Sequence, residues 1–156
     1  MIICTHSPEE TILFGQRLGQ LLQKGEVISL IGEIGAGKTT LAKGIARGLG
    51  IDQPVRSPTF TLIHEYLSSP PFYHIDLYRL EELEQVASLA LDEYYDNGIT
   101  AIEWAEHAGE LIPDERLEIL ISKPVNNERQ IQLIAYGVSA QRILDKLRIN
   151  DVATCD

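Results

Sequence analysis

Apolar residues are arranged along this chain in two patterns that alternate with each other. Some segments hold short continuous apolar runs, which are typical of buried strands, and others hold apolar residues at every third or fourth position, which is typical of helices. The first pattern predicts strands over residues 2–5, 26–31, 59–67, 72–77, 99–103, 116–121 and 130–136. The second pattern predicts helices over residues 8–24, 38–49, 81–95 and 139–147.

The order of these elements predicts an α/β fold with a mixed central sheet. Strands that alternate with helices favour parallel pairing. The turn at residues 68–71, which reads SSPP, predicts that the strands over 59–67 and 72–77 form an antiparallel β-hairpin. The chain has 156 residues, of which 44% are apolar, and it contains no internal repeat or linker, so we expect a single domain over residues 1–156.

A glycine-rich loop lies between the strand over 26–31 and the helix over 38–49. Residues 32–39 read GEIGAGKT, which fits the phosphate-binding pattern G-x-x-x-x-G-K-[ST]. Glycines let such a loop wrap around an anion and direct backbone N–H groups at it, and the N-terminus of the following helix adds its positive dipole end. Lys38 can reach the β- and γ-phosphates, Thr39 can bind Mg²⁺, and Thr40 supports the loop. The loop therefore predicts a P-loop NTPase-type three-layer sandwich; the alternative is a plain glycine turn.

Two acidic residues end predicted strands. Asp76 follows the run FYHI and Glu103 follows ITAI, and both are expected at the carboxyl edge of the sheet, where α/β proteins bind ligands. One carboxylate should hold Mg²⁺ and the other should orient the attacking water. A helix cap or a surface group is the alternative for each. His64 and His74 are expected to pack within their strands or to form hydrogen bonds, and not to bind a ligand.

A polar loop at residues 57–61, which reads SPTFT, is the third candidate. Its hydroxyl groups could sense the γ-phosphate and change their order after hydrolysis. A plain connecting loop is the alternative.

The charge of the chain is unevenly distributed. The net charge is −10, and residues 76–118 hold thirteen acidic residues against Arg79 and Arg116. Such a region repels a polyanion, so we expect no DNA binding and only indirect contact with RNA, although a basic partner could dock there; a solvated acidic surface is the alternative. The chain has no apolar run long enough to span a membrane and no signal-peptide pattern, so we expect a cytoplasmic protein that does not contact membranes.

Six segments of the chain, taken together and in this order, resemble the TsaE (YjeE) family of bacterial ATPases. The segments read SPEET, GEIGAGKTTLAKGIARGLG, SPTFTLIHEY, YHIDLYRL, IEWAE and NERQIQLIAYG. Many unrelated proteins share a glycine-rich loop, but its combination with the other five segments is specific. The resemblance extends over nearly the whole chain and implies a role in forming threonylcarbamoyladenosine (t6A) in tRNA.

The resemblance also implies roles for individual residues in binding ATP and Mg²⁺. Thr39 and Glu103 match the family's metal ligands, and Asp76 matches a second acidic residue needed for hydrolysis. The residues that match the phosphate loop are Ile34, Gly35, Ala36, Gly37, Lys38 and Thr39.

Five further positions follow from the same resemblance. Thr59 and Thr61 match a switch-type loop that takes part in hydrolysis. Arg129 falls where the family places an arginine that contacts the nucleotide, and Pro8 lies in the segment that approaches the base. Trp104, within the EW pair of the motif, is expected near the nucleotide or the partner surface; a core or lid residue is the alternative.

The resemblance implies that ATP hydrolysis drives a cycle of a larger assembly. The partners are TsaB and TsaD, while TsaC supplies the threonylcarbamoyl-adenylate, and the modification falls on adenosine 37 of tRNAs that read codons beginning with adenine. Two alternatives stay open: a small-molecule kinase, and a nucleotide-dependent binding module without significant turnover. The chain has no arginine-rich lid segment of the kind that kinases of this size usually carry.

Overall fold

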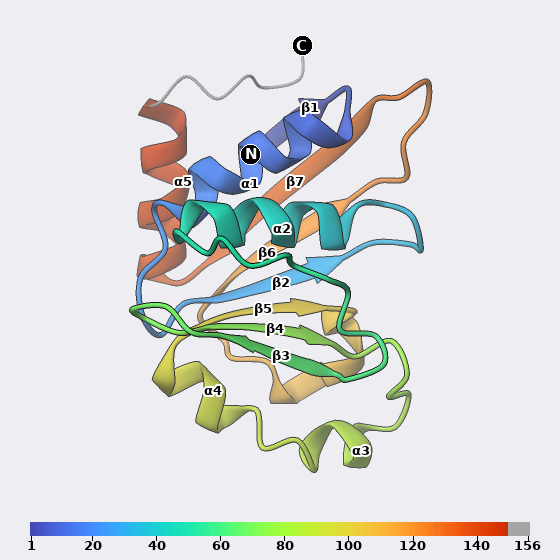
Figure 1. Ribbon diagram of the computed structural model, residues 1–156, viewed down its shortest axis with the longest axis vertical. Coiled ribbons are helices and arrows are strands. Elements are labelled where there is room, and N and C mark those ends of the chain that lie inside the picture. Colours follow the sequence, from blue (N-terminus) through green and yellow to red (C-terminus); the bar gives the residue numbers. More distant parts are fainter. Residues whose placement is uncertain (150–156) are drawn as a thin grey trace.

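A sheet of seven strands forms the centre of the computed structural model, which describes residues 1–149 (Figure 1). The strand order is β1-β7-β6-β2-β5-β4-β3. The four central strands β6, β2, β5 and β4 are parallel, whereas β7 and β3 run antiparallel to their neighbours, so the prediction of a mixed sheet with a β-hairpin is confirmed. The strands are β1 (Ile2–Thr5), β2 (Val27–Ile31), β3 (Ile63–Tyr66), β4 (Phe72–Asp76), β5 (Ile99–Glu103), β6 (Arg116–Ile121) and β7 (Arg129–Tyr136).

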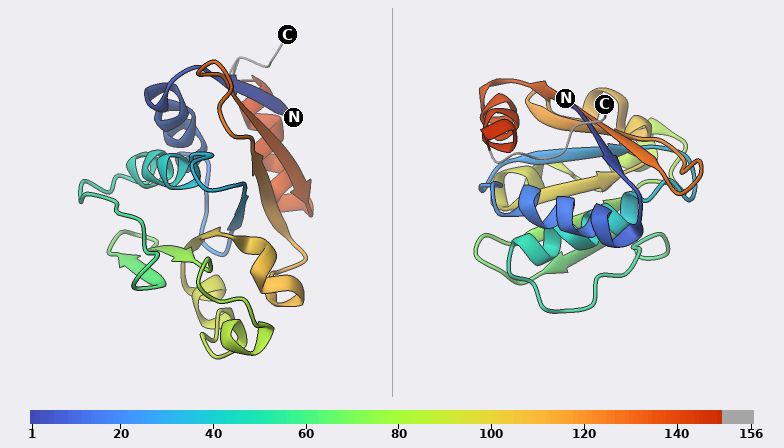
Figure 2. Two further views of the ribbon diagram at one scale, coloured as in Figure 1. Left: turned by 90° about the vertical axis from the view of Figure 1, so that its right-hand side faces the viewer. Right: turned by 90° about the horizontal axis from the view of Figure 1, so that it is seen from above.

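Helices lie on both faces of this sheet, which confirms the predicted three-layer α/β sandwich (Figure 2). Helices α1 and α2 cover one face; α3, α4 and the 3₁₀ helix η1 pack against the other face; and α5 packs against β6 and β7. The helices are α1 (Pro8–Gly19), α2 (Lys38–Gly48), α3 (Leu83–Ala87), α4 (Asp92–Asn97), η1 (Ala105–Leu111) and α5 (Val138–Ile149).

The two faces of the sheet bury separate hydrophobic clusters, because successive side chains of a strand point to opposite faces. On β5, Ala101 packs in the cluster that contains α1 and α2, and Ile102 packs in the cluster that contains α3, α4 and η1. On β4, Phe72 packs in the first of these clusters and Ile75 packs in the second. This alternation places every second residue of β4 and β5 on the side of α2.

Helices α1 and α2 approach each other through glycines. A Cβ atom on Gly15 would lie 2.9 Å from the Cα of Gly44, and one on Gly48 would lie 2.8 Å from the Cα of Gly19. Real Cβ atoms do not approach backbone so closely, so a larger residue at these positions would push the helices apart. The contact fixes α2, and with it the glycine-rich loop, against α1.

The expectation of a single helix over residues 81–95 is wrong. Two short helices, α3 and α4, replace it, and the chain turns between them at Ala90, whose φ is 51°. Val86 and Leu91 are both buried but stand five positions apart, and a helix turns by about 100° per residue, so an unbroken helix could not bury both. The break lets both side chains enter the cluster beneath β4 and β5.

Two other elements are shorter than expected by more than one residue. Strand β3 begins at Ile63 instead of residue 59, because Leu62, with φ of 65°, belongs to a turn whose amides donate to the carbonyl of Pro58. Helix α1 ends at Gly19 instead of residue 24, and the amides of Leu21 and Leu22 donate to carbonyls only three residues back. Residues 150–156 of the expected domain lie outside the described part of the chain. Within residues 1–149, no helix combines the length and the apolar character needed to cross a membrane.

Candidate functional site

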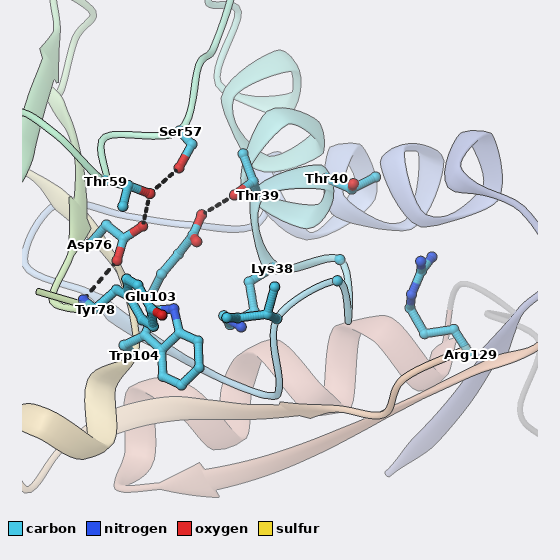
Figure 3. Close-up of a pocket in the computed structure, with 13 residues that line it drawn as sticks. Lys38, Thr39, Thr40, Ser57, Thr59, Asp76, Tyr78, Glu103, Trp104 and Arg129 are labelled. Carbon is cyan, nitrogen blue, oxygen red and sulfur yellow. Dashed lines mark hydrogen bonds between the residues drawn. The ribbon is translucent and has the colours of Figure 1, made fainter. Parts of the chain in front are cut away.

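The glycine-rich loop joins β2 to α2 and borders a cavity of about 400 Å³ (Figure 3). The cavity lies at the carboxyl edge of the parallel strands, which is the usual ligand position in α/β sheets. The residues that line it are Ile34, Gly35, Gly37, Lys38, Thr39, Thr40, Ser57, Thr59, Asp76, Tyr78, Glu103, Trp104 and Arg129.

Two glycines give the loop its shape. Gly35 and Gly37 have φ angles of 81° and 109°, which side-chain-bearing residues rarely adopt. Gly37 also has no room for a side chain, since a Cβ there would lie 2.9 Å from the guanidinium carbon of Arg129. Helix α2 begins directly after Gly37, so its first amides and the positive end of its dipole lie at the cavity.

Lys38 is almost fully buried beside the loop. Its Nζ donates hydrogen bonds to the carbonyls of Gly32 and Glu33 and lies 4.3 Å from the centre of the Trp104 ring. Burial lowers the pKa of Lys38, whereas the carboxylates, among them Glu103, act in the opposite direction. The ammonium group is therefore held by neutral acceptors and a ring face, at a cavity that an anionic ligand could enter.

Glu103 and Thr39 meet at the centre of the site. The Thr39 hydroxyl donates to Oε1 of Glu103 over 2.7 Å, and His74 Nε2 lies 2.8 Å from the same oxygen. Glu103 is only 3% exposed. Among residues 1–149, no three side chains form a cluster that could hold a metal without other ligands. One hydroxyl and one carboxylate fit Mg²⁺, which usually completes its shell with waters and substrate phosphates.

Asp76 occupies the position beside Glu103 on the next strand. The two residues are register partners in the parallel pair of β4 and β5. Asp76 Oδ2 accepts a hydrogen bond of 2.7 Å from Thr59, whose hydroxyl also lies 2.6 Å from the Ser57 hydroxyl. The amide of Tyr78 donates to the other oxygen of Asp76. The predicted polar loop and the predicted acidic pair are thus in direct contact (Figure 3).

Arg129 lies at the opposite end of the cavity, on β7. Its Nη1 donates to the Thr11 hydroxyl over 2.8 Å, and its buried Nε has no hydrogen-bond partner in the described part of the chain. Burial lowers the pKa of Arg129. The unpaired Nε–H group belongs to a cation beside the glycine-rich loop, where an anionic ligand would supply the missing acceptor.

Three residues expected at the site stand away from the cavity lining. Pro8 begins α1 and is exposed. Ala36 is fully buried beneath the loop, and Thr61 is exposed in the turn before β3. Thr40 and Ile34 do line the cavity, as does Trp104, which packs against Tyr78 with ring centres 5.0 Å apart.

His74 is a hydrogen-bonding histidine, which was one of the two roles expected for it, and its partner Glu103 is a central residue of the site. His74 stands two positions before Asp76, so the alternation of a strand places both side chains on the same face. That spacing was the available signal. The partner of His74 could not be read from it, because Glu103 belongs to another strand.

Comparisons with known proteins identify the family of this chain. A family model described as "Threonylcarbamoyl adenosine biosynthesis protein TsaE" matches residues 5–131. The tRNA threonylcarbamoyladenosine biosynthesis protein TsaE of Bacillus subtilis (strain 168) is 41% identical over 149 residues, which cover 94% of this chain and 93% of that protein. The TsaE protein of Nostoc sp. (strain PCC 7120) is 40% identical over 142 residues, which cover 87% and 86%.

A solved structure is also similar over nearly its whole length. The crystal structure of YdiB from Bacillus subtilis superposes with a TM-score of 0.85 at 37% identity and covers 97% of this chain and 95% of its own. The range matched by the family model, residues 5–131, contains the glycine-rich loop and both acidic strand ends. The chain therefore belongs to the TsaE family of threonylcarbamoyl adenosine biosynthesis proteins.

Proposed function

We propose that this chain is a Mg²⁺-dependent ATPase that serves t6A formation at adenosine 37 of tRNAs reading codons that begin with adenine. Membership of the TsaE family supports the place in tRNA modification. The observation that carries the enzymatic part is the contact of Thr39 with Glu103 directly beneath the glycine-rich loop, with Asp76 as the register partner of Glu103. A hydroxyl, two carboxylates and a phosphate loop at one cavity are the parts that nucleotide hydrolysis needs.

Binding of the triphosphate falls to the loop and to Lys38. The backbone N–H groups after Gly35 and Gly37 and the N-terminus of α2 would hold the β- and γ-phosphates. Lys38 would exchange its carbonyl acceptors for phosphate oxygens and so stabilise the charge that develops during transfer. Arg129 would add a second cation from β7.

Thr39 and Glu103 would hold the metal ion. Mg²⁺, when bound, neutralises negative charge on the phosphate oxygens. Asp76 is then available to orient the attacking water, since its carboxylate lies on the neighbouring strand at the same level of the sheet. Thr59, bonded to Asp76, would report the presence of the γ-phosphate to the loop that precedes β3.

The proposed partners are TsaB and TsaD, with TsaC as the source of the threonylcarbamoyl-adenylate, in the cytoplasm. Hydrolysis of ATP alone yields no modified tRNA, so its value lies in driving a cycle of that assembly. We expect slow turnover by the isolated chain and faster turnover in the complex, because an incomplete site is a common way to link hydrolysis to assembly. This chain would contact tRNA only indirectly, through the complex.

Two other functions remain as outcomes of the test. A small-molecule kinase would transfer the γ-phosphate to a metabolite, but the cavity lining contains Arg129 as its only arginine among the described residues, whereas such kinases use several to clamp both substrates. A binding module would hold the nucleotide and release no phosphate, even with its partners.

A reconstitution tests the proposal. Phosphate release and t6A formed over many cycles are measured with TsaB, TsaD, TsaC and tRNA, with and without this chain. Lys38→Ala and Glu103→Ala should lower phosphate release by about 100-fold or more, because each removes a group that stabilises transition-state charge. Lys43→Ala, on the exposed face of α2, is the control and should retain the basal rate.

Each alternative has its own result. Repeated t6A cycles that do not need this chain would remove the proposed role. Transfer of a labelled γ-phosphate to any metabolite faster than to water would favour the kinase. A rate of phosphate release that TsaB and TsaD do not raise would favour the binding module.

A further inference from the structure

The pair formed by His74 and Glu103 is the most deeply buried polar contact of the site. His74 is 0% exposed and Glu103 is 3% exposed, and Nε2 of His74 lies 2.8 Å from Oε1 of Glu103. The two residues come from neighbouring parallel strands, β4 and β5. Both side chains project from the face of the sheet that α2 covers, so the contact lies directly beneath the first turn of that helix.

The chemistry of the contact shows which ring nitrogen of His74 carries the hydrogen. A carboxylate oxygen accepts hydrogen bonds, so Nε2 of His74 must carry the proton and donate. The other ring nitrogen, Nδ1, is buried and has no partner among the described residues. A leucine or phenylalanine could fill this space without burying an unpaired nitrogen, so packing alone does not explain a histidine here. The hydrogen bond to Glu103 does explain it.

Oε1 of Glu103 receives two donors from opposite sides. Thr39 donates from the first turn of α2, and His74 donates from the sheet. Together they fix the rotation of the carboxylate, and no hydrogen bond in the described part of the chain engages Oε2. The ring of His74 is itself held by stacking on Phe72, with centres 6.4 Å apart and planes at 17°. The donor is therefore rigid.

We propose that His74 is a positioning residue that sets the orientation of the Glu103 carboxylate for binding Mg²⁺. The inference rests on the proposed function, in which Glu103 is a metal ligand. Residues that hydrogen-bond to a metal ligand orient it, and their loss typically lowers metal affinity by about 10-fold to 100-fold. His74 does not touch the nucleotide cavity, so its loss should change the requirement for Mg²⁺ and leave metal-free nucleotide binding unchanged.

Two substitutions separate the hydrogen bond from the packing. His74→Phe keeps a ring that can stack on Phe72 but removes the donor. His74→Gln places an amide nitrogen the same number of bonds from the backbone as Nε2 and so keeps the donor. His64→Phe is the matched control, because His64 is the register partner of His74 on β3 and makes no contact with Glu103.

The experiment measures Mg²⁺ half-saturation in two ways: by phosphate release, and by calorimetric binding of a non-hydrolysable ATP analogue at increasing Mg²⁺. His74→Phe should raise the half-saturation concentration by about tenfold or more. His74→Gln should recover most of the loss, and His64→Phe should match the unsubstituted chain. Binding of the analogue without Mg²⁺ should be the same in all of them.

Three results would count against the inference or its basis. A folded His74→Phe chain with unchanged Mg²⁺ dependence overturns the role of His74 while the proposed function stands, provided that Glu103→Ala loses Mg²⁺-dependent binding. A His74→Gln chain as impaired as a folded His74→Phe chain also overturns it. If the unsubstituted chain shows no Mg²⁺-dependent binding, both fail. If thermal melting shows that His74→Phe does not fold, the Mg²⁺ half-saturation of His74→Gln is compared with that of His74→Asn. Asparagine carries the same amide but cannot reach Glu103, so equal values for the two variants would overturn the inference.

Discussion

Thr59 is the residue through which we propose that a bound nucleotide acts on the rest of the chain. Its hydroxyl joins Ser57 to Asp76, so it links the loop before β3 to the acidic end of β4. The segment 59–62 leaves the extended conformation that its sequence favours, and the turn at Leu62 brings Thr59 to Asp76. A tertiary contact has here overruled a local preference for strand.

Thr59→Ala should lower turnover more than it lowers nucleotide binding. Removal of the hydroxyl takes away a hydrogen bond to a charged group, which contributes about 1.5–3 kcal/mol and corresponds to about tenfold or more in rate. Phosphate release and the affinity for a non-hydrolysable analogue are measured in parallel. Thr59→Ser keeps the hydroxyl and is the control. Equal losses in turnover and affinity would argue against a switch.

Single residues of the site could be predicted where their chemistry is local in the sequence. The loop from Gly32 to Thr39 is one continuous segment, and Asp76 and Glu103 each end a strand, so both were found. The bond from Arg129 to Thr11 joins residues 118 positions apart, and the bond from His74 to Glu103 depends on the order of strands. Neither contact has a signal in the sequence near those residues.

At the scale of elements, the pairing of α1 with α2 controls the position of the phosphate loop. Lys38 and Thr39 form the first turn of α2, and the glycine contacts with α1 hold that helix in place. No pattern within α2 alone identifies its partner, because Gly44 and Gly48 read only as weak helix formers. The contact explains why a helix beside a ligand site contains them.

Gly44→Ala should destabilise the chain, although alanine is the better helix former. A Cβ at this position would lie 2.8 Å from the Cα of Gly15. Helix preference alone would add about 0.5–1 kcal/mol of stability, whereas overpacking costs about 1–3 kcal/mol, so we expect a net fall in the melting temperature. Lys43→Ala on the exposed face of the same helix should change it little. A higher melting temperature for Gly44→Ala would contradict the tight contact.

The existence of elements was predicted better than their ends. All seven expected strands are present, because each holds a short apolar run between turn residues. The break at Ala90 was missed, since the apolar residues before and after it each fit a helix when taken alone. Only the requirement that Val86 and Leu91 enter one cluster separates α3 from α4.

At the scale of the whole molecule, negative charge gathers at the end formed by α3 and α4, below β3 in Figure 1. Six acidic residues of this end are exposed: Glu81, Glu82, Glu84, Asp92, Glu93 and Asp96. The surrounding potential disfavours the approach of a polyanion and favours a basic surface. This distribution agrees with contact to tRNA through partner proteins.

The isolated chain should therefore not bind tRNA. Retention of labelled tRNA on a filter, at about 0.15 M ionic strength, should equal that of a protein-free blank, because the net charge of −10 opposes binding and exposed charges act over about 8 Å there. A basic RNA-binding protein of similar size is the positive control. Saturable retention that weakens as salt rises would show a cationic surface that the charge distribution does not suggest.

The register of β4 with β5 has a consequence for how mutations affect the candidate site. Asp76 and Glu103 are joined through the backbone ladder of the sheet, so their Cα atoms stay about 4.8 Å apart whatever happens at the surface. The two carboxylates that we propose for hydrolysis are thus positioned by the sheet and not by the connecting segments. Residues 57–62 have no such ladder: they contact Asp76 through the Thr59 hydroxyl and through the Leu62 carbonyl, which accepts from the Asp76 amide. Changes in that short connection should therefore alter the proposed hydrolysis while leaving the spacing of the two carboxylates unchanged.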